Sequence, residues 1–118
     1  MFVGGIEEIV LKRIEELLDA PESGESAPSL ARIETTLTDG YAHVLALEAE
    51  RSRIERRIGE VAITAEDRVA TGLAEELAAL ATRMRGADGE LRKLRSMLGR
   101  LNDRARSARR QTIPDLTA

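Results

Sequence analysis

Few side chains in this sequence could carry out chemistry, and they lack the combinations that common active sites require. The chain has no cysteine, which excludes disulfides, thiolate metal ligands and a cysteine nucleophile. His43 is the only histidine, and one histidine without cysteine cannot build a common zinc site. The sequence contains no Gly-rich phosphate loop and no nucleophile elbow. We therefore expect no catalytic residue, metal or cofactor, and we expect His43 to be a satisfied histidine on the flank of a helix.

Arg51 is the charged residue that stands out, because it interrupts a row of apolar residues. An arginine at such a position lowers stability and usually specifies the alignment of helices or the choice of partner. The spacing of the chain predicts Glu76 as its neighbour. We interpret Arg51 as a residue that sets alignment, with a small ligand site beside it as the alternative.

Charge is unevenly distributed along the chain. Residues 1–50 hold eleven acids and three bases, whereas residues 83–110 hold ten bases and three acids. If the chain folds back on itself, much of this charge is neutralised. Five arginines extend beyond the expected start of the second helix: Arg100, Arg104, Arg106, Arg109 and Arg110.

These five arginines allow more than one interpretation. They could pair with an acidic first helix, face a protein partner, or bind the phosphates of a nucleic acid. No aromatic residue accompanies them, so stacking on bases has no support. We rank nucleic-acid binding below protein binding.

The segment Ala49–Ile54, followed by Ile58–Glu60, resembles the long first helix of the all-helical chorismate mutases. In that family an arginine stands upstream of the residue matched by Arg51, and a lysine stands downstream of it. Glu34 and Ala62 occupy those two places here. Because both active-site cations are missing, the resemblance does not extend to the activity.

Two long rows of apolar residues are the elements that would position these side chains. In both rows the spacing alternates between three and four residues, with a single step of four and four near the start of the second row. This is the heptad pattern of a coiled-coil seam. The first row is Leu30, Ile33, Leu37, Gly40, Val44, Leu47, Arg51, Ile54, Ile58 and Val61, and the second is Val69, Leu73, Leu77, Leu80, Met84, Ala87, Leu91, Leu94, Leu98 and Leu101. We predict an all-α fold in which residues 30–110 form a long antiparallel coiled-coil helical hairpin.

The register of this hairpin follows from where the chain turns. A fold-back near Thr64 pairs residues whose numbers add to about 127 or 128. This register places Gly40 opposite Ala87, and Arg51 opposite Leu77 with Glu76 beside it.

Thr64 is expected to cap a third helix that starts at about residue 65, with Glu66 and Asp67 at its positive end. That helix is expected to continue through Gly86–Gly89 to Arg110. A continuous helix through residue 64, paired between two chains, is the competing interpretation.

The remaining segments flank the hairpin. Residues 1–19 are predicted to form an amphipathic helix with a wide apolar face, which packs on protein. Residues 20–29 are rich in Pro, Gly and Ser and read as a flexible linker. Residues 111–118 are expected to be a disordered tail.

Composition points to a helical protein. Charged residues make up 33% of the chain and aromatic residues 2%, which is poor material for a sheet or an aromatic-lined pocket. No stretch approaches the roughly 20 apolar residues of a membrane span, and the start is too acidic for a signal peptide. A cytoplasmic location is the expectation.

These patterns predict a non-enzymatic coiled-coil module for protein–protein interaction: a regulator, an adaptor or an assembly subunit. An Ala-rich surface from Val69 to Met84 extends beyond the seam, which predicts a homodimer through the hairpin tips and an additional protein partner. The alternative is a nucleic-acid-associated regulator that uses the basic end of the third helix.

Overall fold

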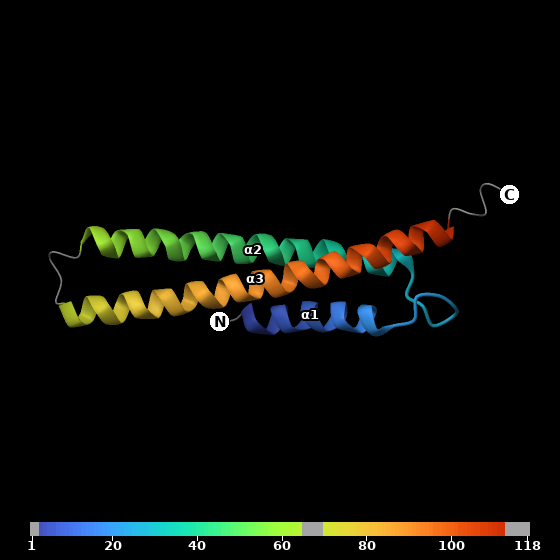
Figure 1. Ribbon diagram of the computed structural model, residues 1–118, viewed down its shortest axis with the longest axis horizontal. Helices are drawn as coiled ribbons and strands as arrows, with labels where there is room; N and C mark the ends of the chain where they lie inside the picture. The colour runs from blue at the N-terminus through green and yellow to red at the C-terminus, as the bar shows by residue number, and fades with distance from the viewer. Residues whose placement is uncertain (1–2, 65–69, 113–118) are drawn as a thin grey trace. The chain divides into compact units, whose positions relative to one another are not determined.

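The fold is a helical hairpin with a third, shorter helix. The computed structural model describes the backbone of residues 3–64 and 70–112, and the side chains of residues 8–64 and 72–111. Within these residues there are three helices and no strand: α1 at Val3–Asp19, α2 at Leu30–Ile63 and α3 at Ala70–Thr112 (Figure 1). Helices α2 and α3 pack against each other. The predicted antiparallel hairpin is confirmed, and the continuous helix through residue 64 is wrong because α2 ends at Ile63.

Local signals in the sequence explain how α2 begins and ends. At its start, the Ser29 hydroxyl accepts a hydrogen bond from the backbone N–H of Arg32 at 3.1 Å, the usual geometry of an N-terminal cap. At its end, the Thr64 hydroxyl donates to the carbonyl oxygens of Glu60 at 3.1 Å and Val61 at 3.3 Å. Thr64 therefore satisfies the last turn of α2, and the cap that we expected from it on the next helix involves residues 65–69, outside the described residues.

Helix α3 is continuous from Ala70 to Thr112. It passes through Gly86 and Gly89 without a break, as the uninterrupted seam predicted. It also extends two residues beyond the expected end at Arg110, and the rest of the predicted tail, residues 113–118, lies outside the described residues.

The chain divides into two compact units. The first, which we call the three-helix unit, comprises Met1–Val44 and Leu94–Ala118. In it Val10, Ile14 and Leu17 of α1 are buried, with Ile14 and Leu17 almost completely enclosed. Its buried apolar residues are Val10, Ile14 and Leu17 of α1, Ile33, Leu37 and Val44 of α2, and Leu94, Met97, Leu98, Leu101 and Ala105 of α3.

The second unit, which we call the two-helix unit, comprises Leu45–Lys93. Its core is the heptad seam alone. Ile54, Val61 and Leu80 are buried, and four partly buried residues pack against them: Ile58, Leu73, Leu77 and Met84. The described apolar residues expected in the seam of this unit are therefore the residues that form it, and Val69 lies outside the described residues.

The axial alignment of α2 and α3 differs from the predicted register. A Cβ atom built on Gly40 would collide with the side chain of Leu98, whose Cγ lies 3.3 Å away. The expected neighbour was Ala87, which comes earlier in α3. Because apolar residues recur along each seam at regular steps, sliding one helix by a heptad, or by a heptad and a further turn, brings apolar residues together again. Spacing thus identifies the seam but leaves its alignment open.

Candidate interaction surfaces

Arg51 lies at the edge of the seam in the two-helix unit, with its side chain partly exposed. Its Nε donates a hydrogen bond to Oδ1 of Asp88 at 2.6 Å, and its Nη1 donates one to Oε1 of Glu55 at 2.9 Å. The hydrogen bond to Asp88, together with the attraction of Asp88 and Glu55, raises the pKa of Arg51 above its ordinary value. Glu76 is not its partner, so that expectation was wrong for the same reason as the register. A guanidinium held by an acid of each helix fits a role in alignment.

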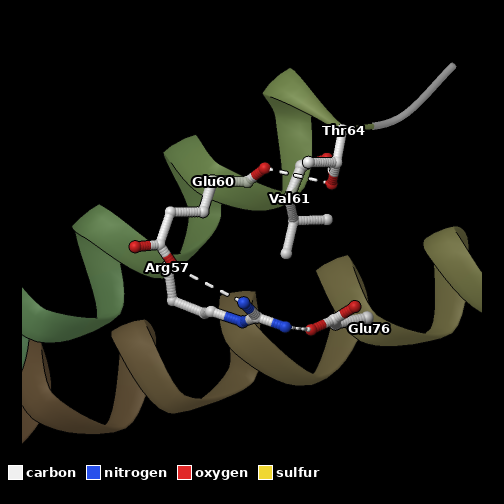
Figure 2. Close-up of polar contacts among 5 residues, drawn as sticks. All are labelled: Arg57, Glu60, Val61, Thr64 and Glu76. Atoms are coloured by element: carbon white, nitrogen blue, oxygen red, sulfur yellow. Dashed lines mark hydrogen bonds and ion pairs between the residues drawn. The ribbon is translucent and has the colours of Figure 1, made fainter. Parts of the chain in front are cut away.

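Glu76 instead pairs with Arg57, as Figure 2 shows. Nη2 of Arg57 donates to Oε2 of Glu76 at 2.7 Å, and Nη1 donates to Oε1 of Glu60 at 3.4 Å. The hydrogen bond to Glu76 is the main reason that the pKa of Arg57 is raised. Sequence reasoning missed Arg57, although its spacing of three residues from Glu60 is a signal for an exposed ion pair.

A second pair between the helices lies on the same flank of the hairpin. Nη2 of Arg83 is 3.2 Å from Oε2 of Glu50, whose other carboxylate oxygen is 3.1 Å from Arg53. Arg83 follows Glu76 by seven residues on α3, and Glu50 precedes Arg57 by seven on α2. Residues seven apart share one face of a helix, so these charges line one edge of the seam.

The five arginines near the end of α3 do not form one surface. Nη2 of Arg104 donates to the carbonyl oxygen of Leu18 at 2.7 Å and also to that of Ala20. These carbonyls belong to the C-terminal end of α1, where the helix dipole favours a cation. The side chain of Arg104 therefore binds backbone carbonyls at the end of α1, and not the acidic side chains of that helix.

The other four arginines have separate environments. Nη2 of Arg109 pairs with Oε2 of Glu34 at 2.9 Å, and Arg106 lies 3.8 Å from Asp103 on its own helix. The residue numbers of this pair add to 143, above the 127 or 128 expected from a turn near Thr64, so this pair also reflects the shifted register. Arg100 and Arg110 are exposed and form no ion pair with the side chains that the structure describes.

Two polar residues in the three-helix unit were misjudged or missed from the sequence. His43 is only 7% exposed, and its Nε2 has no hydrogen-bond partner among the described residues. The expectation of a satisfied flank histidine was therefore wrong, because the three-helix unit buries a position that the seam pattern leaves unassigned. Arg13 of α1 pairs with Asp39 of α2 at 2.6 Å, a contact that no short-range spacing signals.

The largest exposed apolar side chains of the two-helix unit lie on α2. Leu45 is 67% exposed and Ile63 is 83% exposed. Between them, exposed residues continue with alternating spacings of four and three. We call this set the outer stripe; it consists of Leu45, Ala49, Ser52, Arg56, Gly59 and Ile63. The pattern was present in the sequence, but the more apolar seam masked it.

Helix α3 contributes a second exposed surface to this unit. Ala74, Ala78 and Ala79 are exposed, in the Ala-rich region that the sequence placed outside the seam.

Among the described residues, no helix is long and apolar enough to span a membrane. The same residues contain no group of three or more acidic, histidine or cysteine side chains placed to hold a metal ion.

No protein-family model, curated protein or solved structure matches this chain.

Proposed function

We propose that this chain is a non-enzymatic helical module for protein–protein interaction, and that its two-helix unit is the part that associates. The observation that carries the proposal is the apolar surface that this unit leaves in solvent. Two helices can cover only the sides that face each other, and the residues on their other sides include Leu45, Ile63, Ala74, Ala78 and Ala79, all exposed. Such surfaces mark interaction sites when they are contiguous.

A second copy of the chain is the first partner that we propose, since closed twofold dimers are the commonest assemblies of soluble proteins. A further protein partner, for which the chain would act as a regulator or adaptor in the cytoplasm, remains part of the proposal. The nucleic-acid alternative has less support, because Arg104 and Arg109 are engaged in contacts within the three-helix unit.

Sedimentation equilibrium between about 1 and 100 µM tests self-association, because a dimer of micromolar affinity changes its population across that range. We expect the average mass to rise from 12.9 kDa towards twice that value. A mass that stays at the monomer value up to the highest concentration would reject self-association. Salt-dependent binding to a DNA duplex, measured alongside, would favour the alternative.

A further inference from the structure

We infer that the outer side of α3 binds the phosphate backbone of a nucleic-acid duplex. This site adds a second binding activity to the proposed protein contact and does not depend on it. We call the site the basic face; it consists of Arg85, Arg92, Lys93, Arg100 and Arg110.

The five bases share one side of a single helix. At 100° per residue they lie within an arc of about 100°, centred about 180° around α3 from the buried seam residues Leu94 and Leu98. All five are exposed. Because α3 is unbroken from Ala70 to Thr112, the helix alone aligns these bases along its axis.

Acids of the chain leave the basic face uncompensated. None of its five bases forms an ion pair with a side chain that the structure describes. Arg85 donates a hydrogen bond to the hydroxyl of Thr82 at 3.2 Å, a group without charge. Asp103 is the one acid in the same arc between residues 85 and 110, and it lies 3.8 Å from Arg106, outside the face.

The bases of α3 that bind another helix lie nearer the seam. Arg83 pairs with Glu50 and Arg109 pairs with Glu34, while Arg104 binds carbonyl oxygens at the end of α1. The contacts within the chain therefore use a different set of bases and leave the basic face available.

The length and the composition of the basic face suit a duplex. From Arg85 to Arg110 it extends about 38 Å, close to the roughly 34 Å of one duplex turn. A duplex carries charge evenly along that length. Gly89, Ser96 and Ser107 separate the bases, so no large side chain stands between the cations and the phosphates. Four of the five bases are arginines, whose guanidinium groups bind phosphate through two parallel hydrogen bonds.

Other anionic partners fit this face less well. The arc that it occupies contains no apolar or aromatic residue between residues 85 and 110. A helix that lies on a membrane needs an apolar side, and a protein interface needs an apolar core. A single strand also lacks an aromatic platform on which its bases could stack. A duplex requires only contacts with its phosphates.

The first experiment measures binding of the full chain to a labelled duplex of about 20 base pairs. Fluorescence anisotropy is followed between about 50 and 200 mM salt, with DNA and with RNA. If all five bases contact phosphates, the logarithm of the association constant should fall with the logarithm of salt concentration with a slope of about −4.5. Binding to either duplex supports the inference, and the tighter complex identifies the source of the phosphates. The absence of salt-dependent binding to both would overturn it.

The second experiment separates the basic face from net charge with matched double substitutions. Arg92→Gln with Arg100→Gln removes two bases of the face. Arg32→Gln with Arg56→Gln removes two exposed arginines of α2 that form no ion pair with the described side chains. At about 100 mM salt, the first pair should weaken binding at least about tenfold and reduce the slope by about 2. The second pair should change the affinity less than about twofold, since distant charges are screened. An equal loss in both would overturn the basic face.

The third experiment locates the duplex with single cysteines, which the sequence lacks. Ser96→Cys carries a photocrosslinker at the centre of the basic face, and Ala49→Cys carries one on α2; both positions are exposed. We expect irradiation to link the duplex to the Ser96→Cys chain and to leave the Ala49→Cys chain unlinked. Linkage through Ala49→Cys alone would overturn the inference. Tighter binding of a 20-residue polyglutamate peptide than of either duplex would also overturn it, because the occupant would then be an acidic protein segment.

Discussion

Gly40 of α2 lies directly against the side chain of Leu98 of α3, so close that the glycine leaves no room for a methyl group. Leu98 has no exposed surface and cannot swing into solvent. This contact fixes the alignment of the two helices in the three-helix unit, because only a residue without a side chain fits beside the leucine.

Gly40→Ala should therefore be less favourable than the same change elsewhere. In a helix interior, alanine stabilises the helix by about 1 kcal/mol relative to glycine. At residue 40, however, the added methyl group would overpack against Leu98, which costs about 1–3 kcal/mol of stability. Gly86→Ala is the matched control, because no atom lies within 4 Å of its added Cβ. Urea denaturation should show Gly40→Ala less stable than Gly86→Ala by about 1–3 kcal/mol. Equal stabilisation by both changes would contradict the contact.

A disulfide between residues 40 and 98 tests the register directly. In Gly40→Cys with Leu98→Cys, the second change removes the leucine atoms that would collide. Because Cγ of Leu98 is 3.3 Å from the ideal Cβ of residue 40, the two Cβ atoms fall near disulfide range. We expect rapid intramolecular oxidation of this pair. The pair Gly40→Cys with Ala87→Cys should remain reduced, and its oxidation instead would restore the register expected from a turn at Thr64.

His43→Leu should stabilise the protein. A buried polar atom without a hydrogen bond costs about 1–3 kcal/mol, and Nε2 of His43 is such an atom among the described residues. Leucine has a similar size and no polar group, so we expect a gain of about 1 kcal/mol in the free energy of unfolding. Tyr41→Leu is a control at an exposed position, where little change is expected. A loss of stability in His43→Leu would show that the imidazole has a partner.

Arg104→Ala should loosen α1 without unfolding the hairpin. Its guanidinium binds the carbonyls of Leu18 and Ala20 at the end of α1, and its loss leaves that end uncapped. Amide hydrogen exchange in α1 should become about tenfold faster. This change corresponds to a free energy of local opening that is lower by about 1.4 kcal/mol. Exchange in α2 should stay unchanged. Arg100→Ala is the control, because it removes an exposed arginine of α3. It should leave the exchange rate of α1 at the wild-type value. An equal effect of both changes would mean that the loss of positive charge, and not the loss of the hydrogen bonds, opens α1.

The hairpin could be predicted because its cause is local and repeated. Each heptad from Ile33 to Val61 and from Leu77 to Leu101 independently indicates one buried side of a helix. Alignment has a different origin, since a repeating row matches its partner at several offsets. Only irregular positions such as Gly40 distinguish these offsets, and its partner Leu98 has no feature that sets it apart from Leu91 or Leu94 in the sequence.

The polar contacts depended on that alignment and could not be predicted without it. Arg51 was identified from its position in the seam, yet its acids, Glu55 and Asp88, differ from the one expected. The burial of His43 arises within the three-helix unit, which brings together segments that are distant in the sequence. The outer stripe keeps the same spacing, but its central residues are small or polar, so an apolar pattern does not mark it in the sequence.

The bond between Arg104 and the carbonyl of Leu18 joins residues 86 positions apart, and this separation has a consequence for biosynthesis. At about 5–20 residues per second, a ribosome adds Arg104 roughly 4–17 s after Leu18. During that interval the segment of α1 lacks the arginine that binds its end and the α3 residues that complete its unit. Its acidic side chains, Glu8, Glu15 and Glu16, all exposed in the finished protein, give neighbouring nascent chains the same negative charge. Like charges repel, so this acidity opposes association between uncovered apolar faces of neighbouring nascent chains before α3 is complete.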